Sequence, residues 1–392
     1  MLRGIYFFVA PVRPRCSIVG VWLLRGACRA VFAADSEVNG YPVGAGEEIV
    51  VPVGRSVLAR SDKRPEGTCE PVAVSDETYE SYLRAAEELV GLGERVMLVG
   101  PSDSGKTTLA SFVASQLGGA LYLTVDVGQN ELYSPGFTAA ARVEGPLIPG
   151  SGSAPTSRCF VGAFSPARAP LRYIACARAL SRPGPIIVDT DGWVEAWEGL
   201  DSKVALSRAL DIEVLGVLDM PPAMARYLER EAGARVLQLP RLASNTVKTR
   251  EERRIHRERL LARALQGSKK YSVNPDAVPV YGAPVFVGEP LMGEALDLVS
   301  SIIGHRPLYA EKIGERIVVV TRRRIRPPPR VRALVQGWER GLIAASHPGD
   351  GDPCVALIDS IDYRRRRIRL LSPCKPTAVH VGLDRVGIEG FT

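Results

Sequence analysis

The sequence is poor in the side chains that hold structural metals. Its seven cysteines form no CxxC pair and it has only four histidines, so no ligand spacing typical of a zinc site is present. We therefore expect reduced cysteines in an intracellular, cytoplasmic protein. A small disulfide-stapled scaffold is excluded by length, because 392 residues can bury a large hydrophobic core.

The chain also lacks a long apolar run. Near the N-terminus Ile5–Ala10 and Ser17–Leu24 are apolar, but Pro11, Arg13 and Pro14 separate them. Each run is too short to span a bilayer or to form the core of a secretory signal. We predict a strand in each run and no membrane partner.

Charge is the one compositional feature that departs from the average. Hydrophobic residues at 46% and charged residues at 24% are ordinary for a globular protein, but the net charge is +7. Residues 321–392 contain twice as many Lys and Arg as Asp and Glu, so this segment carries the surplus. An anionic partner would fit there.

The apolar pattern predicts three parts. Residues 1–75 have short apolar stretches and no helical period, which predicts a small β-rich module. In residues 76–320 strands alternate with helices, which is typical of an α/β fold with a doubly wound, mostly parallel sheet. Residues 321–392 open with the basic, proline-rich run TRRRIRPPPRVR, which we interpret as a joint before a C-terminal β-rich module. Its predicted strands are Leu342–Ala345, Val355–Ile358 and Ile368–Leu371.

A phosphate-binding loop is the strongest motif. Gly100–Thr107 fits GxxxxGK[ST] without mismatch, between a predicted strand and a predicted helix. Glycines let backbone N–H groups surround phosphate oxygens, Lys106 supplies a positive charge, and the Thr107 hydroxyl can bind Mg²⁺. The residues predicted to bind the nucleotide are Gly100, Pro101, Ser102, Asp103, Ser104, Gly105, Lys106, Thr107 and Thr108.

Two aspartates, one inside the loop and one after the next predicted strand, belong to the predicted site. Asp126 ends the predicted strand Ala120–Val125, so we predict that it completes the Mg²⁺ site with Thr107 and accepts the proton of an attacking hydroxyl. A helix N-cap is the alternative role. Asp103 would repel phosphates if it faced them, so we predict that it points outward and binds an arginine from a closing segment.

The loop alone does not identify the substrate, because many classes of nucleotide enzyme contain such a loop. The NKxD motif of guanine-binding proteins is absent. Several further blocks resemble one family in the expected order: Gly100–Thr108, Val125–Gln129 (DxGQ-like), Cys159–Pro166, Asp189–Val194 (NTxGW-like), Val247–Arg250, Glu339–Ile343, Ile361–Asp362 and Ser372–Pro373. The sequence thereby resembles the polynucleotide 5′-hydroxyl kinases of RNA processing, which include pre-mRNA cleavage-factor and ribosomal-RNA-processing kinases and archaeal relatives.

This resemblance implies a P-loop kinase that uses ATP and Mg²⁺ to phosphorylate the 5′-hydroxyl of an RNA or DNA strand, with RNA-processing proteins as partners. It also implies substrate contacts from Gln129, Ser165, Thr190 and Trp193. The Trp193 indole could stack on a base, although a core tryptophan is the alternative. Gln129 and Ser165 could equally make local backbone hydrogen bonds. The chain departs from the family after Trp193, where Glu195–Leu200 replaces a glycine-rich run.

An arginine-rich helical stretch near residues 244–267 completes the predicted site. Arg250, Arg253, Arg254 and Arg257 recur at i, i+3, i+4 and i+7, so one helical face carries all four. We predict a catalytic lid that neutralises charge on the transferred phosphate, with a solvated, salt-bridged helix as the alternative. The basic runs Arg322–Arg326 and Arg364–Arg369 would suit either a nucleic-acid backbone or a solvated surface.

A function of another class remains open. A non-catalytic scaffold that holds ATP and organises an RNA-processing complex would keep the same loop. Intact Lys106, Asp126 and lid arginines favour catalysis over the scaffold.

Overall fold

The computed structural model describes residues 20–52, 55–148, 150, 155–242 and 249–387. The predicted strand Ile5–Ala10, residues 17–19 of the second predicted strand and residues 244–248 of the predicted lid lie outside the described residues. Among the residues described, none of the helices has both the length and the apolar character needed to cross a membrane.

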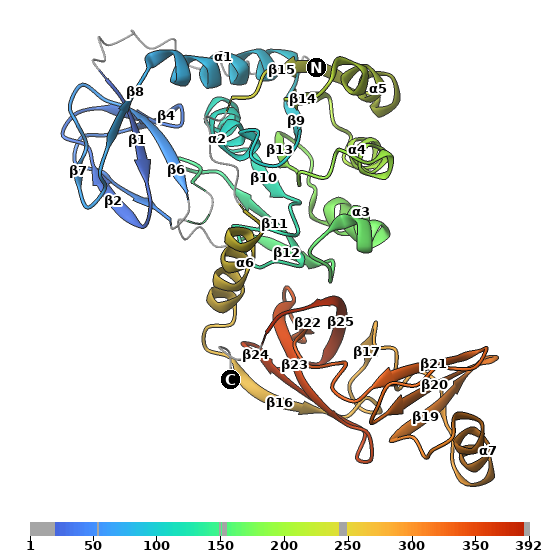
Figure 1. Ribbon diagram of the computed structural model, residues 1–392. Helices are drawn as coiled ribbons and strands as arrows, with labels where there is room; N and C mark the ends of the chain where they lie inside the picture. Colours follow the sequence, from blue (N-terminus) through green and yellow to red (C-terminus); the bar gives the residue numbers. More distant parts are fainter. Residues whose placement is uncertain (1–19, 53–54, 149, 151–154, 243–248, 388–392) are drawn as a thin grey trace, which may run out of the picture.

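The N-terminal part consists of two small antiparallel sheets, drawn in blue in Figure 1. The five-stranded sheet has the order β4 (Tyr41–Val43), β3 (Ser36–Val38), β6 (Ser56–Arg60), β1 (Val21–Arg25) and β8 (Val72–Val74). The three-stranded sheet has the order β5 (Glu48–Val51), β2 (Cys28–Val31) and β7 (Glu66–Gly67). Alternating burial along β5 gives the three-stranded sheet one apolar face, and residues of both sheets share a core that includes Leu24 and Phe32.

The central part is built on a seven-stranded sheet. Its order is β12 (Ser157–Phe160), β11 (Phe137–Arg142), β10 (Leu121–Thr124), β13 (Ile186–Asp189), β9 (Arg95–Val99), β14 (Val214–Leu218) and β15 (Arg235–Leu239). The last five are parallel, and β11 and β12 add antiparallel edge strands. All five residues of β14 are buried, as expected for a strand covered on both faces.

Helices cover both faces of this sheet, so the predicted doubly wound α/β fold is confirmed. One face packs against α1 (Asp76–Leu92) and α2 (Lys106–Leu117). The other packs against α3 (Pro170–Leu180), α4 (Trp197–Ala209) and α5 (Pro222–Ala232), and a short 3₁₀ turn at Pro166–Arg168 precedes α3. The carboxyl ends of β9, β10 and β13 thus form an edge where ligands of such folds bind.

The C-terminal part follows α6 (Arg250–Ala264) and contains two sheets. The six-stranded sheet has the order β16 (Lys269–Val273), β24 (Arg367–Ser372), β23 (Cys354–Asp362), β22 (Leu342–His347), β25 (Ala378–Arg385) and β17 (Val280–Tyr281). The four-stranded sheet has the order β18 (Glu289–Pro290), β19 (Tyr309–Ile313), β20 (Arg316–Thr321) and β21 (Val331–Val335), with α7 (Gly293–Ile303) beside it. The predicted strands Leu342–Ala345, Val355–Ile358 and Ile368–Leu371 correspond to β22, β23 and β24.

The sheets of the C-terminal part begin well before the boundary that we predicted at residue 321. Its edge strand β16 starts at Lys269 and pairs with β24, about a hundred residues later in the chain. The basic run TRRRIRPPPRVR joins no two domains, because it connects the parallel neighbours β20 and β21 within one sheet. Two-residue strands and one intervening helix gave residues 269–320 the appearance of a continued α/β pattern.

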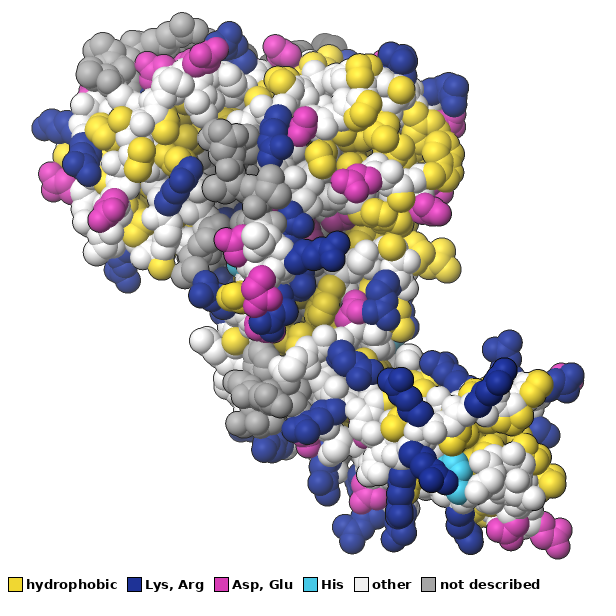
Figure 2. Space-filling view, in the orientation of Figure 1, with side chains coloured by type: hydrophobic (Ala, Val, Ile, Leu, Met, Phe, Trp, Pro, Cys, Tyr) yellow, Lys and Arg dark blue, Asp and Glu magenta, His cyan; other side chains and the backbone are white. Residues whose placement is uncertain are grey.

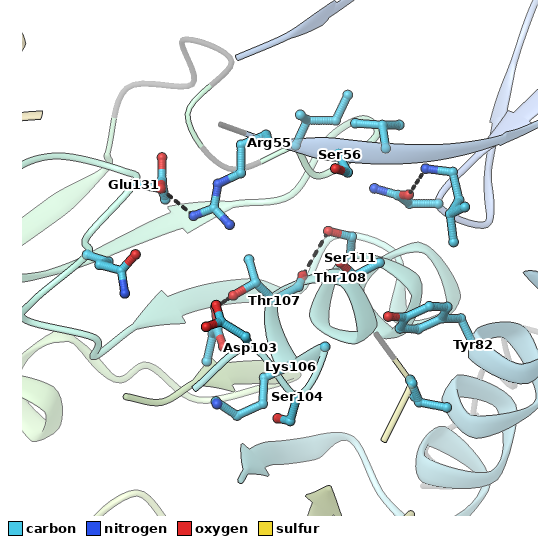
Figure 3. Close-up of a pocket in the computed structure, with 18 of the residues that line it drawn as sticks. Arg55, Ser56, Tyr82, Asp103, Ser104, Lys106, Thr107, Thr108, Ser111 and Glu131 are labelled. Atoms are coloured by element: carbon cyan, nitrogen blue, oxygen red, sulfur yellow. Dashed lines mark hydrogen bonds and ion pairs between the residues drawn. The ribbon is translucent and has the colours of Figure 1, made fainter. Parts of the chain in front are cut away.

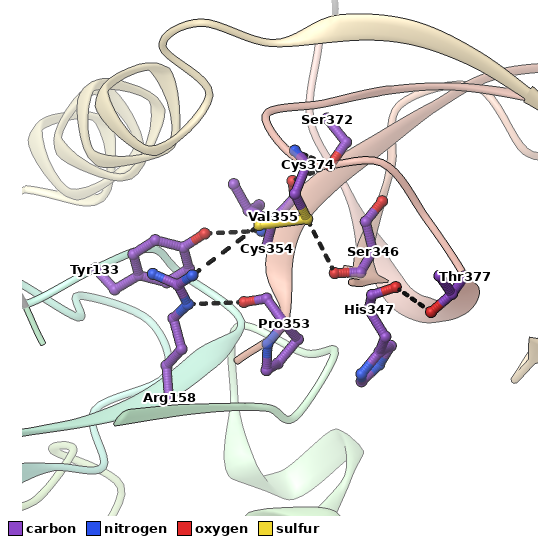
Figure 4. The surroundings of a disulfide bond; sticks show 10 residues. All are labelled: Tyr133, Arg158, Ser346, His347, Pro353, Cys354, Val355, Ser372, Cys374 and Thr377. Atoms are coloured by element: carbon purple, nitrogen blue, oxygen red, sulfur yellow. Dashed lines mark hydrogen bonds between the residues drawn. A yellow bond between two sulfur atoms is a disulfide. The ribbon is translucent and has the colours of Figure 1, made fainter. Parts of the chain in front are cut away.

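The C-terminal sheet docks on the antiparallel edge of the central sheet. Ile343, Val355 and Leu357 pack with Phe137 and Phe160 of β11 and β12. Figure 4 shows the polar contacts of this joint, in which the Val355 N–H donates to the Tyr133 hydroxyl at 2.8 Å. The Arg158 guanidinium stacks over the Tyr133 ring and donates to the Pro353 carbonyl at 2.8 Å.

Our expectation of reduced cysteines is wrong for the described part of the chain. Disulfides join Cys28 to Cys69, Cys159 to Cys176 and Cys354 to Cys374, while Cys16 lies outside the described residues. The missing CxxC pattern argues against metal binding, but it carries no information about cysteines that the fold brings together from 17 to 41 residues apart. Disulfide-rich proteins also occur inside hyperthermophilic cells, so the predicted cytoplasmic location stays a prediction.

We expect the Cys28–Cys69 bond to contribute measurably to stability. It closes a loop of 41 residues, and loop-closure entropy in the unfolded chain predicts a loss of about 2–4 kcal/mol on its removal. Chemical denaturation of a Cys28→Ser/Cys69→Ser variant would measure this loss. A variant whose transition midpoint and slope match the parent protein under oxidising conditions would contradict the expectation.

Candidate active site

The phosphate-binding loop connects β9 to α2. Asp103 and Gly105 adopt positive φ angles of 60° and 102°, and this left-handed backbone curls the loop around the first turn of the helix. Lys106 is only 7% exposed, and its Nζ donates to the carbonyls of Gly100 at 2.8 Å and Pro101 at 2.7 Å. An ammonium group has three N–H donors, so one remains to meet a phosphate oxygen.

A cavity of about 270 Å³ opens beside this loop. Figure 3 shows that one wall comes from the loop and α2, and the opposite wall from Arg55 and Ser56 of the N-terminal part. Seven of the nine predicted nucleotide-binding residues line the cavity, and Gly100 and Pro101 do not: the lining residues are Ser102, Asp103, Ser104, Gly105, Lys106, Thr107 and Thr108. Its volume, polar loop and buried cation suit a nucleotide phosphate chain.

Thr107 meets a different carboxylate from the one that we predicted. Its hydroxyl donates to Asp189 Oδ2 at 2.7 Å, and no hydrogen bond joins it to Asp126 among the described residues. Asp189 Oδ1 is buried without a hydrogen-bond partner among the described residues, next to this hydroxyl. A threonine hydroxyl and an unpaired carboxylate oxygen are the hard oxygen ligands that Mg²⁺ prefers, so these residues fit the ion. Asp189 ends the apolar strand β13, and this strand-end signal could have identified it.

Asp126 lines the same cavity but is held differently. Its Oδ1 accepts from the backbone N–H groups of Gly128 at 2.9 Å and Gln129 at 3.0 Å, so it stabilises a turn rather than capping a helix. Burial raises the pKa of Asp126, and the negative charges of Asp191 and Asp189 raise it further. A carboxylate with a raised pKa is a better proton acceptor, which suits the predicted role as general base.

The lid helix α6 divides its four arginines between two directions. As predicted, Asp103 pairs with an arginine of a closing segment, because Arg253 donates to its Oδ2 at 2.8 Å. Arg257 lies over the Phe164 ring, 5.8 Å from the ring centre. Burial lowers the pKa of Arg257, and the negative charge of Asp126 has a smaller effect that raises it.

The other two arginines of the lid are exposed. Arg254 pairs with Glu251 and Glu258 on its own helix, and Arg250 is exposed at the helix start. That all four arginines act in catalysis stays a prediction. Of the four, Arg253 contacts the phosphate loop and Arg257 lies where the Asp126 charge acts on its pKa.

The predicted substrate residues have separate environments. Gln129 and Thr190 line the cavity, but the Thr190 hydroxyl donates to the Leu98 carbonyl at 2.7 Å and so helps to hold the sheet. Ser165 is half-buried in the turn before the 3₁₀ helix, where its carbonyl accepts from Arg168. Trp193 is half-buried and follows Gly192, where a Cβ would collide with Ser102 of the phosphate loop. Glycine at this position lets the Trp193 loop pack against the phosphate loop.

A buried charge network that sequence reasoning missed supports Trp193. Asp191 Oδ1 accepts from the Trp193 N–H at 2.8 Å. Its Oδ2 accepts from the Tyr173 hydroxyl at 2.9 Å and from Lys203, which is fully buried, at 2.6 Å. The network holds the backbone of the Trp193 loop. Lysine twelve residues after an aspartate gives no local signal, because their contact depends on how α4 packs against β13.

A second unforeseen network closes the opposite side of the cavity. The buried carboxylate of Glu131 contacts both Arg55 of the N-terminal part and His256 of α6. The backbone carbonyl of Glu131 also accepts from Arg263 of α6 at 2.7 Å. One residue thus fastens the lid helix and the N-terminal part to the central part.

Glu131 should make stability depend on pH at the acid end. Burial alone would raise the pKa of Glu131, but the Arg55 charge and the His256 hydrogen bond outweigh it and lower the pKa from 4.5 to about 2. A lowered pKa stabilises the fold above the unfolded value of 4.5, and this contribution disappears as pH falls toward 2. The shift corresponds to about 3 kcal/mol.

Denaturant unfolding of the Glu131→Gln variant between pH 7 and pH 2 tests this expectation. The variant should lose stability near neutral pH and show a shallower decline on acidification than the parent protein. Parallel curves for the two proteins would contradict the assignment.

Comparison with known proteins places this site in context. Residues 100–267 match the family model described as "mRNA cleavage and polyadenylation factor CLP1 P-loop". The predicted resemblance is confirmed. The matched range contains the phosphate loop, Asp126, Asp189, Trp193 and the lid helix.

Relatives of this chain include archaeal proteins that are named as kinases. A polyribonucleotide 5′-hydroxyl-kinase of Methanocaldococcus jannaschii is 26% identical over 296 residues, which cover 71% of this chain and 81% of the relative. Another, from Pyrococcus horikoshii, is 24% identical over 341 residues, which cover 81% and 93%. A solved Clp1p–Pcf11p complex contains a similar fold, with a TM-score of 0.63, 16% identity and coverage of 93% of this chain and 96% of that one.

Proposed function

We propose that the protein is an ATP-dependent polynucleotide 5′-hydroxyl kinase acting in RNA processing or repair. The observation that carries this proposal is that Lys106, Thr107 and Asp126 line one cavity, while Arg253 of α6 pairs with Asp103 of the same lining. The names of the archaeal relatives supply the acceptor, a 5′-hydroxyl of a polyribonucleotide. DNA strands are a second candidate acceptor that the experiment below includes.

Each residue would have a separate role. The loop N–H groups and Lys106 bind the phosphate chain and stabilise charge on the transferred group. Thr107 and Asp189 would hold Mg²⁺, which neutralises phosphate charge when bound. Asp126 accepts the proton from the incoming 5′-hydroxyl, and Arg253 and Arg257 close over the phosphates from α6. Trp193 would support the terminal base, with Gln129 and Ser165 near the acceptor end.

Transfer of labelled phosphate tests the proposal. We expect the label of γ-phosphate-labelled ATP to appear at the 5′ end of 5′-hydroxyl RNA, with ADP formed in equal amount. A matched RNA that already carries a 5′-phosphate should accept none, and matched DNA reveals the sugar preference. Absence of label on every 5′-hydroxyl strand in the presence of Mg²⁺ would refute the proposal.

A scaffold that holds ATP without transferring phosphate is the second candidate. The observation that favours it is that the structural relative is a complex of Clp1p with another protein, Pcf11p. On either reading, RNA-processing proteins are proposed partners of this chain. Prolonged incubation with ATP, Mg²⁺ and 5′-hydroxyl RNA separates the two candidates, because a scaffold retains its ATP and releases no ADP.

A further inference from the structure

Three basic side chains share one face of the C-terminal six-stranded sheet. In β24, Arg367 and Arg369 are exposed and alternate with two buried aliphatic residues, so both side chains point to the same side. In the neighbouring strand β16, Lys270 is exposed and lies opposite Leu371 of β24. Because directly paired residues project to the same side, Lys270 joins the two arginines on this face. We name these three residues the basic face.

The basic face lies on the same side of the six-stranded sheet as the residues that pack against the end of the lid helix α6. The register pairs Leu371 of β24 with Leu357 of β23, so both point to the side of Arg369. Leu357 packs in one cluster with Leu261 and Leu265, which belong to the last turn of α6 and the residue just after it. The end of α6 therefore lies beside the basic face.

The same helix reaches the phosphate loop at its other end. Arg253, in the first turn of α6, donates to Asp103 of the loop. A helix of 15 residues is about 22 Å long. The phosphate loop and the basic face thus lie near opposite ends of this helix, and Figure 1 shows β16 and β24 next to the end of α6 that is farther from α2.

Acidic side chains do not neutralise the basic face. Within the described ranges, no carboxylate lies at ion-pair distance from Lys270, Arg367 or Arg369, whereas Arg366 beside them pairs with Asp276. Asp362 lies opposite Arg367, but one of its oxygens accepts from the Arg365 N–H at 3.0 Å. Figure 2 shows Lys and Arg side chains gathered over the C-terminal part. An unneutralised cationic surface attracts a polyanion.

We propose that the basic face binds the sugar–phosphate backbone of the acceptor strand beyond its 5′ end. This inference rests on the proposed function and defines its substrate class as strands long enough to run the length of α6. Alternate residues of a strand lie about 6.8 Å apart, a spacing comparable with that of successive phosphates in an extended nucleic-acid strand. The three side chains offer no base-specific pocket, so this binding is independent of sequence.

The direct test compares RNA binding by the protein and by a triple variant, Lys270→Gln/Arg367→Gln/Arg369→Gln. Fluorescence anisotropy with a labelled long 5′-hydroxyl RNA should show at least about tenfold weaker binding by the variant, and the salt slope should fall by about 2. Phosphorylation of a dinucleotide, which cannot reach the basic face, should keep its kcat/KM, and the KM for ATP should not change.

A matched control removes the same charge elsewhere. The variant Arg322→Gln/Arg323→Gln/Arg324→Gln alters exposed residues that connect β20 to β21 in the other sheet, and it should bind long RNA as the parent protein does. Equal weakening by both variants would overturn the proposal in favour of a general charge effect. Unchanged RNA affinity of the first variant, with lost binding to an acidic protein, would overturn it in favour of a protein partner.

The binding measurement is independent of phosphate transfer. A protein that binds long strands through the basic face but transfers no phosphate would overturn the proposed function while supporting this surface. A protein that phosphorylates dinucleotides and long strands equally well, with or without the basic face, would support the proposed function and overturn the role of this surface.

Discussion

Replacing Lys106 with alanine should lower the rate of phosphate transfer by at least about 10³-fold. The ammonium group is buried at the base of the loop, and the carboxylates of Asp189, Asp126 and Asp191 oppose the lowering of its pKa by burial. Charge that develops on the transferred phosphate would meet this cation in a site with little water, where an electrostatic contact is strong. Steady-state kinetics with saturating 5′-hydroxyl RNA measure the loss.

The control for this prediction is Lys312→Ala, which removes an exposed lysine of β19 far along the chain. It should retain full activity. Circular dichroism should show that Lys106→Ala keeps its fold, since within the described residues the hydrogen bonds of this side chain go to two carbonyls of its own loop. A well-folded Lys106→Ala variant with undiminished transfer would rule out the loop as the reaction centre.

The second large effect concerns Asp126 and Asp189, two of the aspartates that line the cavity. Asp126→Asn keeps the oxygen that accepts from Gly128 and Gln129 but removes the proton acceptor, so we expect kcat to fall by about 10²–10⁴-fold. Because burial raises the pKa of Asp126, the acid limb of the wild-type pH–rate profile should lie above 3.8, the ordinary value for aspartate. Rate measurements between pH 4 and pH 9 should show this limb in the parent protein and not in the variant.

Asp189→Asn serves as the matched comparison. It should shift the Mg²⁺ concentration needed for half-maximal rate upward, because Asp189 carries the free carboxylate oxygen beside Thr107. An unchanged Mg²⁺ requirement in Asp189→Asn, or a normal rate and acid limb in Asp126→Asn, would contradict the division of roles.

Contiguous signals predicted the centre of this molecule. The phosphate loop is a run of eight residues whose strand and helix neighbours are also local, and the pairing of Asp103 with an arginine followed from electrostatics alone. The parallel sheet followed from apolar strands that alternate with helices. These features depend on neighbouring residues, which the sequence displays directly.

Features that depend on distant segments escaped prediction. Thr107 meets Asp189 because β13 lies between β9 and β10 in the sheet. Neither the phosphate-loop motif nor the Asp189–Val194 block gives information about the order of the strands. Glu131 joins Arg55 and His256 from two other segments. The four lid arginines share one helical stripe, but only tertiary packing decides that its Arg253 edge faces the loop. The disulfides and the early start of the C-terminal sheet at Lys269 have the same cause.

The most direct test of the account is a crystal structure of the protein with a non-hydrolysable ATP analogue, Mg²⁺ and a short 5′-hydroxyl RNA. We predict that the γ-phosphate lies against the Gly100–Thr107 loop, in line with a 5′ oxygen that donates a hydrogen bond to Asp126. A loop without phosphate, or an RNA 5′ end bound away from Asp126, would contradict it.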